Sequence, residues 1–165
     1  MTPGIDGVGL LSQEIIEKIS SRVLAGVPET ELLKDIHMRG VLRVELPEEE
    51  FPFQYTLAGR PAGFNVDLIH EIGWVLGAKP NVEIGRTEMG GMEELDFFIY
   101  KSKKDGEVAI GGIPFFFLGE EQGWLVMYVT DGDEGLTEAI KRILDYLEET
   151  GVFARLYRRY FHEEG

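Results

Sequence analysis

The feature that most constrains the fold is a strand-like run that leads, through an aromatic loop, into an amphipathic helix. The run spans Val41 to Leu46, and apolar spacing predicts the helix from Phe64 to Leu76. Gly77 follows the last apolar position, which is where a helix commonly ends. A strand joined to a helix is the building unit of α/β proteins, so this stretch predicts a sheet covered by helices.

The helix is predicted to open with the hexapeptide GFNVDL of residues 63–68. Asn65 and Asp67 fall in its first turn, where side-chain oxygens satisfy free backbone N–H groups and negative charge favours the positive helix end. We therefore expect both side chains to cap the helix.

The remaining elements extend this unit into an α/β lobe. The further helices are expected at residues 12–24 with Ser12 as N-cap, 29–38, 91–103, 134–149 and 153–161, and the further strands at 81–85, 107–113 and 124–129. Alternating strands and helices predict a three-layer α-β-α arrangement with a mostly parallel sheet. The connection before Trp124 is too short for a crossover helix, so this last strand is predicted to run antiparallel.

The length of 165 residues predicts one domain of ordinary size. Residues 1–39 are expected to form a helical extension, and residues 40–165 the α/β lobe. The pattern leaves open whether the extension docks on the lobe or meets a partner.

Charge and composition exclude several classes of function. A net charge of −14 argues against binding to nucleic acid phosphates, and the absence of cysteine excludes disulfides and thiolate metal sites. Neither a signal peptide nor a membrane-inserting run is visible, so the chain is expected to be cytoplasmic as written or a mature form without its export signal. His37, His70 and His162 lack metal-ligand spacing. We predict no metal, no cofactor and no catalytic constellation.

Four blocks of the sequence resemble the extracellular solute-binding protein family 3, the binding proteins of polar amino acid ABC transporters, which have the type II periplasmic binding protein fold. The blocks are residues 40–44, 63–68, 105–113 and 136–161. The resemblance covers lobe one only, with residues 118–123 standing where lobe two is missing. It implies a non-enzymatic, periplasmic or extracellular protein that binds an amino acid or another small polar solute.

The resemblance also implies that the ligand site is weakened or lost. The family holds the ligand carboxylate with a threonine and an arginine, at positions that correspond closely to Pro114 and Gly119. Neither residue offers the required contacts. A shallow site is predicted to remain near Phe51, Phe53, Asp67 and Gly112.

The run Phe115, Phe116 and Phe117 supports an alternative function. Strand alternation places Phe115 and Phe117 on one face and Phe116 on the other, so a lone lobe does not easily bury all three. They either lie in a core under the N-terminal helices or form an apolar patch with Phe51 and Phe53. Such a patch, at the former lobe-two face, predicts a protein-protein interaction module that binds a partner or a second copy as a homodimer.

Overall fold

A five-stranded sheet forms the centre of the molecule. The computed structural model describes residues 3–85, 95–102 and 110–161, with side chains from residue 13 onward. In chain order the elements are α1 (Pro3–Val23), α2 (Glu31–Arg39), β1 (Val41–Leu46), β2 (Tyr55–Leu57), β3 (Arg60–Ala62), α3 (Phe64–Leu76), β4 (Lys79–Ile84), β5 (Phe97–Lys101), β6 (Ile113–Gly119), β7 (Gly123–Val129), a 3-10 turn (Thr130–Gly132), α4 (Glu134–Glu149) and α5 (Val152–Tyr160).

The strand order is β4-β1-β5-β7-β6, and β2 pairs with β3 in a separate hairpin. Strand β1 is parallel to β4 and β5, whereas β7 is antiparallel to both β5 and β6. Only β7 therefore runs against the other four strands. This confirms the predicted α/β class and the antiparallel direction of the strand that contains Trp124.

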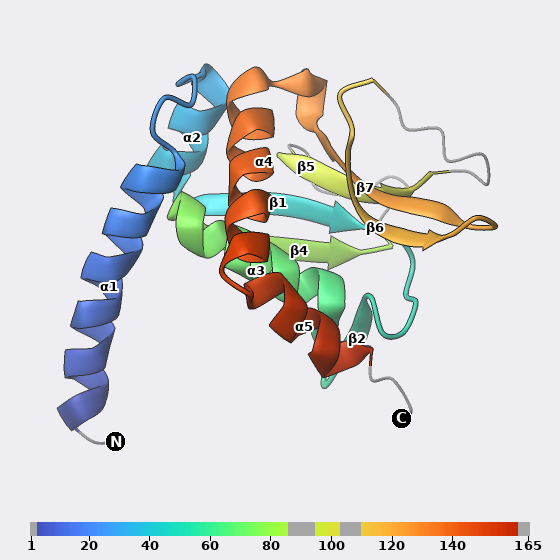
Figure 1. Ribbon diagram of the computed structural model, residues 1–165, viewed down its shortest axis with the longest axis horizontal. Coiled ribbons are helices and arrows are strands. Elements are labelled where there is room, and N and C mark those ends of the chain that lie inside the picture. Colours follow the sequence, from blue (N-terminus) through green and yellow to red (C-terminus); the bar gives the residue numbers. More distant parts are fainter. Residues whose placement is uncertain (1–2, 86–94, 103–109, 162–165) are drawn as a thin grey trace.

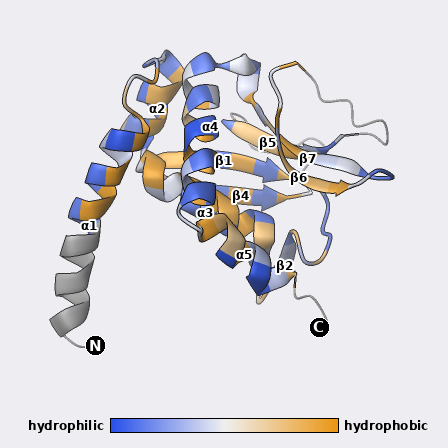
Figure 2. Ribbon diagram, in the orientation of Figure 1, coloured by the Kyte–Doolittle hydropathy of each residue, from blue (hydrophilic) through white to orange (hydrophobic). Residues whose placement is uncertain are grey.

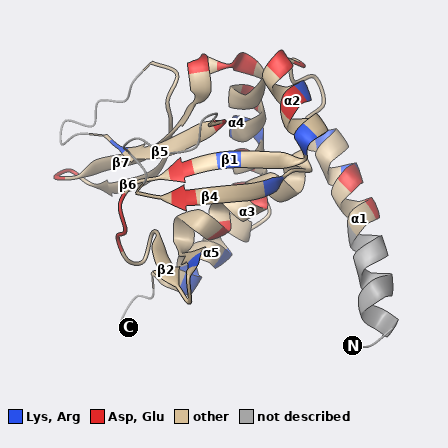
Figure 3. Cartoon of the chain, turned by 180° about the vertical axis from the view of Figure 1, so that it is seen from behind, with Lys and Arg blue, Asp and Glu red and all other residues tan. Residues whose placement is uncertain are grey.

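Helices α3, α4 and α5 cover one face of the sheet, as the opposite views of Figures 1 and 3 show. The sheet and this helical layer are two of the three predicted layers, and they are formed by the described residues. Strand β1 turns Leu42, Val44 and Leu46 toward the helices, where each is at most 1% exposed. Figure 2 shows the matching apolar colouring of β1 and α3. Burial of this face drives the assembly of the lobe.

The entry into α3 requires a glycine. Gly63 has a φ of 122°, in the region that favours glycine, and a Cβ at this position would lie 2.5 Å from the carbonyl oxygen of Phe53. That approach is closer than van der Waals contact allows. The loop and the helix therefore meet at backbone distance, which fixes how the aromatic loop lies on α3.

Two of the predicted elements are wrong. Residues 97–101, expected within the helix of residues 91–103, form the strand β5. The spacing of Leu95, Phe98 and Ile99 fits a helix, but the observed burial alternates, with Phe97 and Ile99 buried and Phe98 and Tyr100 less so. Short aromatic and β-branched runs are ambiguous between these two periods. Most of the remainder of that predicted helix lies outside the described residues.

The predicted strand of residues 107–113 is the second wrong element, because the observed strand begins later in the sequence. Residues 107–109 lie outside the described part of the chain, Ile110 and Gly111 form a turn, and strand β6 begins only at Ile113. Strands β6 and β7 both belong to the sheet and pair with each other, and only residues 120–122 connect them. The short connection expected before Trp124 is therefore present, and it lies within residues 118–123, where the resemblance places the missing lobe two.

The N-terminal helices differ from expectation at their starts. Helix α1 begins at Pro3, so Ser12 lies within it rather than at its N-cap. Helix α2 is capped by Thr30, whose hydroxyl accepts from the N–H of Leu33 and donates to the carboxylate of Asp133 at 2.7 Å. Asp133 in turn caps α4. A hydrogen bond between the two capping residues thereby connects the starts of α2 and α4. The N-terminal end of α1 points away from the lobe (Figure 1).

Candidate functional site

The aromatic loop between β1 and α3 is held by Asn65, which is not a helix cap. The N-cap position is Gly63, which has no side chain to make a capping bond. Asn65 is fully buried and its Nδ2 donates to Oε1 of Gln54 at 2.7 Å, while Gln54 Nε2 donates to the carbonyl of Glu48 at 3.0 Å. The capping prediction for Asn65 is wrong because the buried loop amide offers it a better partner.

Asp67 also makes a tertiary contact instead of capping. Its Oδ2 accepts from Arg159 Nη1 at 2.8 Å and from the Tyr160 hydroxyl at 2.7 Å. Both partners belong to α5, so this carboxylate fastens the last helix to α3. Burial, followed by the hydrogen bond to Asp67, raises the pKa of Tyr160 to about 12.

We expect Tyr160 to ionise at unusually high pH. Its folded pKa of about 12 exceeds the ordinary value of 10.0, so its contribution to stability is fully present below pH 10.0 and is lost as the pH rises through 12. Ultraviolet titration of tyrosinate, with circular dichroism to follow folding, should show a late step that is missing in Tyr160→Phe. If the variant instead lacks a step near pH 10, the assigned contact is wrong.

Phe53 belongs to a phenylalanine cluster beneath α5. We define this cluster as Phe53, Phe64, Phe116, Phe153 and Phe161. Phe64 is its centre, fully buried, with ring centroids of the other members between 5.3 and 6.4 Å away. Phe53 itself is 9% exposed, so most of its ring already contacts protein.

The other predicted ligand residues lie apart from this cluster. Phe51 is 75% exposed, and its ring lies near the ring of Tyr55 at a centroid distance of 4.9 Å. Gly112 lies just before β6 and is half-buried. The structure thus places Phe53 and Asp67 in contacts with the C-terminal segment, and leaves Phe51 toward solvent.

The three consecutive phenylalanines do not form one exposed patch. Phe116 belongs to the phenylalanine cluster, and Phe117 is 53% exposed and lies against Trp124 at 5.1 Å. The register of β6 shifts between Pro114 and Phe116, which leaves a bulge at Phe115. Bulges redirect side chains; Phe115 is half-buried and lines a pocket.

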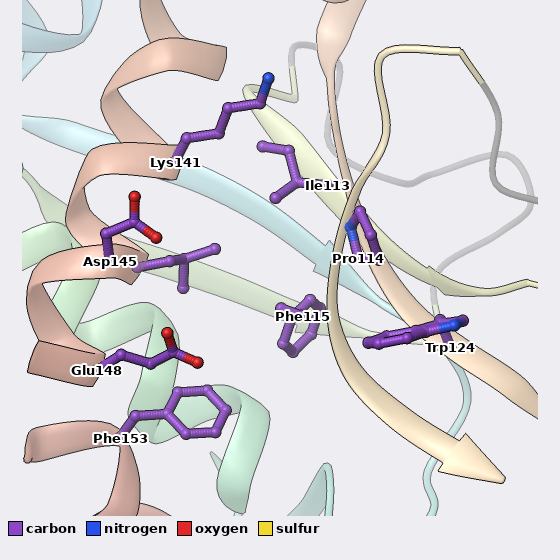
Figure 4. A pocket seen from close by; sticks show the side chains of 9 residues that line it. Ile113, Pro114, Phe115, Trp124, Lys141, Asp145, Glu148 and Phe153 are labelled. Carbon is purple, nitrogen blue, oxygen red and sulfur yellow. The ribbon is translucent and has the colours of Figure 1, made fainter.

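This pocket, which we call the edge pocket, lies between α4 and the strands β6 and β7 (Figure 4). Its volume is about 360 Å³, and it is lined by Ile113, Pro114, Phe115, Trp124, Lys141, Leu144, Asp145, Glu148 and Phe153. Figure 4 shows the carboxylates of Asp145 and Glu148 on one side, with Phe115 and Trp124 on the other. The sequence reasoning missed it; its one signal was the spacing of Lys141, Asp145 and Glu148 on one face of α4.

A wider and more open hollow lies at the carboxyl ends of β1 and β5. Its volume is about 880 Å³, and its lining includes Glu48, Glu49, Glu50 and Lys101. Figure 3 shows the acidic residues gathered at the ends of β1 and β4 and in the loop after β1. Lys101 Nζ lies 2.9 Å from the carboxylate of Glu50, so its charge is already paired.

Among the described residues, no group of three or more His, Asp or Glu side chains is placed to hold a metal ion. None of the helices in this part of the chain has both the length and the apolar character that a membrane span needs.

Comparisons with known proteins identify the fold of this chain. No protein-family model matches the sequence, and no curated protein matches it. Among solved structures, the ancestral amino acid-binding protein AncCDT-1, a precursor of cyclohexadienyl dehydratase, matches with a TM-score of 0.57 and 17% identity, over 78% of this chain and 99% of that chain.

Two further solved structures agree with this match. A mutant of ArgBP from T. maritima gives a TM-score of 0.56 and 16% identity, over 80% of this chain and 100% of that one. An ABC uptake transporter substrate binding protein from Streptococcus pneumoniae, with bound histidine, gives a TM-score of 0.54 and 10% identity, over 79% of this chain and 96% of that chain. The chain therefore has the fold of a single lobe of a type II periplasmic binding protein.

Proposed function

We propose that the chain is a non-catalytic, single-lobe binding domain of solute-binding ancestry, in which the inherited amino acid site is weakened or lost. One observation carries this proposal. Phe53 and Asp67, two of the four residues expected to hold the ligand, are occupied by contacts within the protein. Phe53 packs in the phenylalanine cluster, and the Asp67 carboxylate is shared by Arg159 and Tyr160.

The geometry of a lone lobe supports the same conclusion. Tight capture of a small polar ligand requires a pocket that buries most of its surface. The hollow at the carboxyl ends of β1 and β5, where open α/β sheets commonly bind ligands, is open and is rimmed by Glu48, Glu49 and Glu50. These charges repel a ligand carboxylate, and Lys101, the lysine among the described lining residues, is paired with Glu50. Water therefore competes with any bound amino acid.

Calorimetric titration with a panel of amino acids tests the proposal. We expect dissociation constants of about 1 mM or weaker for neutral and acidic amino acids. The variant Phe51→Ala serves as the site probe, because this exposed side chain is removed without disturbing the core. Micromolar binding that Phe51→Ala weakens would show that the inherited site has survived.

The second candidate is a protein-protein interaction module on the same fold. It is favoured by the exposed side chains of Phe51 and Phe117, which are 75% and 53% accessible. Large exposed aromatic side chains are enriched at interfaces. Light scattering after size-exclusion chromatography separates a homodimer from the 18.6 kDa monomer, and a homodimer that uses Phe117 should dissociate in Phe117→Ser.

A further inference from the structure

The edge pocket combines negative charge with aromatic walls. Asp145 and Glu148 are exposed on α4 and point toward the cavity, facing the rings of Phe115 and Trp124 (Figure 4). In the part of the chain that the structure describes, neither carboxylate forms an ion pair. A positive group placed between them and the rings would meet a carboxylate on one side and a π-face on the other.

The lining also has an apolar part. Ile113, Leu144 and Phe153 contribute to the walls, so a ligand that carries its charge on a hydrocarbon stem fits better than a bare ion. Lys141 lines the pocket as well, and Figure 4 shows its side chain extending away from Asp145 and Glu148. A volume of about 360 Å³ accommodates a small organic molecule or one long side chain. A divalent metal ion would prefer more oxygen ligands than the two carboxylates offer.

The bulge in β6 shapes the pocket. By adding one residue opposite β7, it leaves Phe115 out of the regular register, and Phe115 then lines the cavity beside α4. Bulges that redirect a side chain are common beside binding sites. The net charge of −14 adds a field that attracts cations.

From these observations we propose that the edge pocket binds an organic cation, a primary ammonium or guanidinium group on an aliphatic stem. The pocket shares no residue with the predicted ligand site of Phe51, Phe53, Asp67 and Gly112, so this proposal is independent of the proposed function. The cation has two sources with the same chemistry: a free amine, or a lysine or arginine side chain of another protein.

The test uses the fluorescence of Trp124. The chain has two tryptophans, and Trp74→Phe removes the other one, which is 60% exposed. In this background the protein is titrated with cadaverine, with agmatine, and with the neutral analogue 1-pentanol. Both cations should give a saturable change in emission, and 1-pentanol should not. Equal binding of 1-pentanol, or no saturable response to any cationic probe, would overturn the proposal.

The pocket is assigned by a matched pair of variants. Asp145→Asn/Glu148→Gln should weaken cadaverine binding by about tenfold or more. Glu29→Gln/Glu149→Gln removes the same two charges from exposed positions outside the pocket and should leave binding unchanged. Equal weakening in both variants would mean a general charge effect and would reject the site.

The source of the cation is resolved in the same assay. A pentapeptide of four alanines around a central lysine, blocked at both ends, is compared with its glutamine counterpart and with cadaverine. Tighter binding of the lysine peptide indicates a protein side chain, and tighter binding of cadaverine a free amine; either supports a cation site. Repeating the amino acid panel in Asp145→Asn/Glu148→Gln separates side-chain binding of lysine or arginine here from binding at the inherited site.

Discussion

Replacing Arg39 with methionine should lower the free energy of unfolding by about 3–5 kcal/mol. Arg39, at the end of α2, donates to both oxygens of Asp96 at 2.8 and 3.0 Å, and Asp96 is 1% exposed. The same carboxylate accepts from the backbone N–H of Arg43 in β1 at 2.7 Å. Without the guanidinium, a buried negative charge keeps only part of its compensation.

Denaturant unfolding followed by circular dichroism measures this loss. The matched control is Lys34→Met on the same helix, since the Lys34–Glu31 pair is exposed and 4.0 Å apart; it should change stability by about 0.5 kcal/mol or less. The double variant Arg39→Met/Asp96→Leu should recover part of the loss, because it removes both charges. An Arg39→Met variant as stable as Lys34→Met would refute a structural role for this pair.

Phe64→Ala should cost about 3–5 kcal/mol of unfolding free energy. Phe64 is fully buried at the centre of the phenylalanine cluster and contacts rings from the loop, β6 and the C-terminal segment. Truncation leaves a cavity among stiff aromatic rings that cannot easily close over it. The loss is therefore expected near the upper end of the range for core substitutions.

The measurement is again chemical unfolding, with near-ultraviolet circular dichroism to report the packing of the aromatic rings. Phe51→Ala is the matched control, because Phe51 is 75% exposed and its loss should change stability by about 0.5 kcal/mol or less. A similar small loss for both substitutions would show that the cluster does not hold α5 in place.

The local sequence pattern was sufficient to predict the helices and strands that have strong apolar periodicity. The predicted bounds of β1, α3 and α4 agree with the structure, because a two-residue or 3.6-residue apolar repeat is visible without knowledge of neighbours. Strand β5 was mistaken for a helix because its five residues fit both repeats.

Side-chain partners far apart in sequence were beyond local reasoning. Asp67 and Arg159 are separated by 92 residues. The local sequence therefore predicted a helix cap for the Asp67 carboxylate, because it does not show that α5 packs beside α3. The edge pocket escaped prediction for the same reason. Its carboxylates lie on α4 and its rings come from β6, β7 and α5, and the bulge at Phe115 has no signature in composition.

The position of β6 has a consequence for the edge of the sheet. Without this strand, β7 would be the margin of the sheet and would expose an unpaired row of backbone N–H and C=O groups, a template for fibre growth. Strand β6 covers that row, and β6 itself contains Pro114 and two shifts in its register with β7, irregularities that hinder the addition of a further strand. At this margin of the sheet, the hairpin should therefore disfavour the strand-by-strand growth that leads to β-rich aggregates.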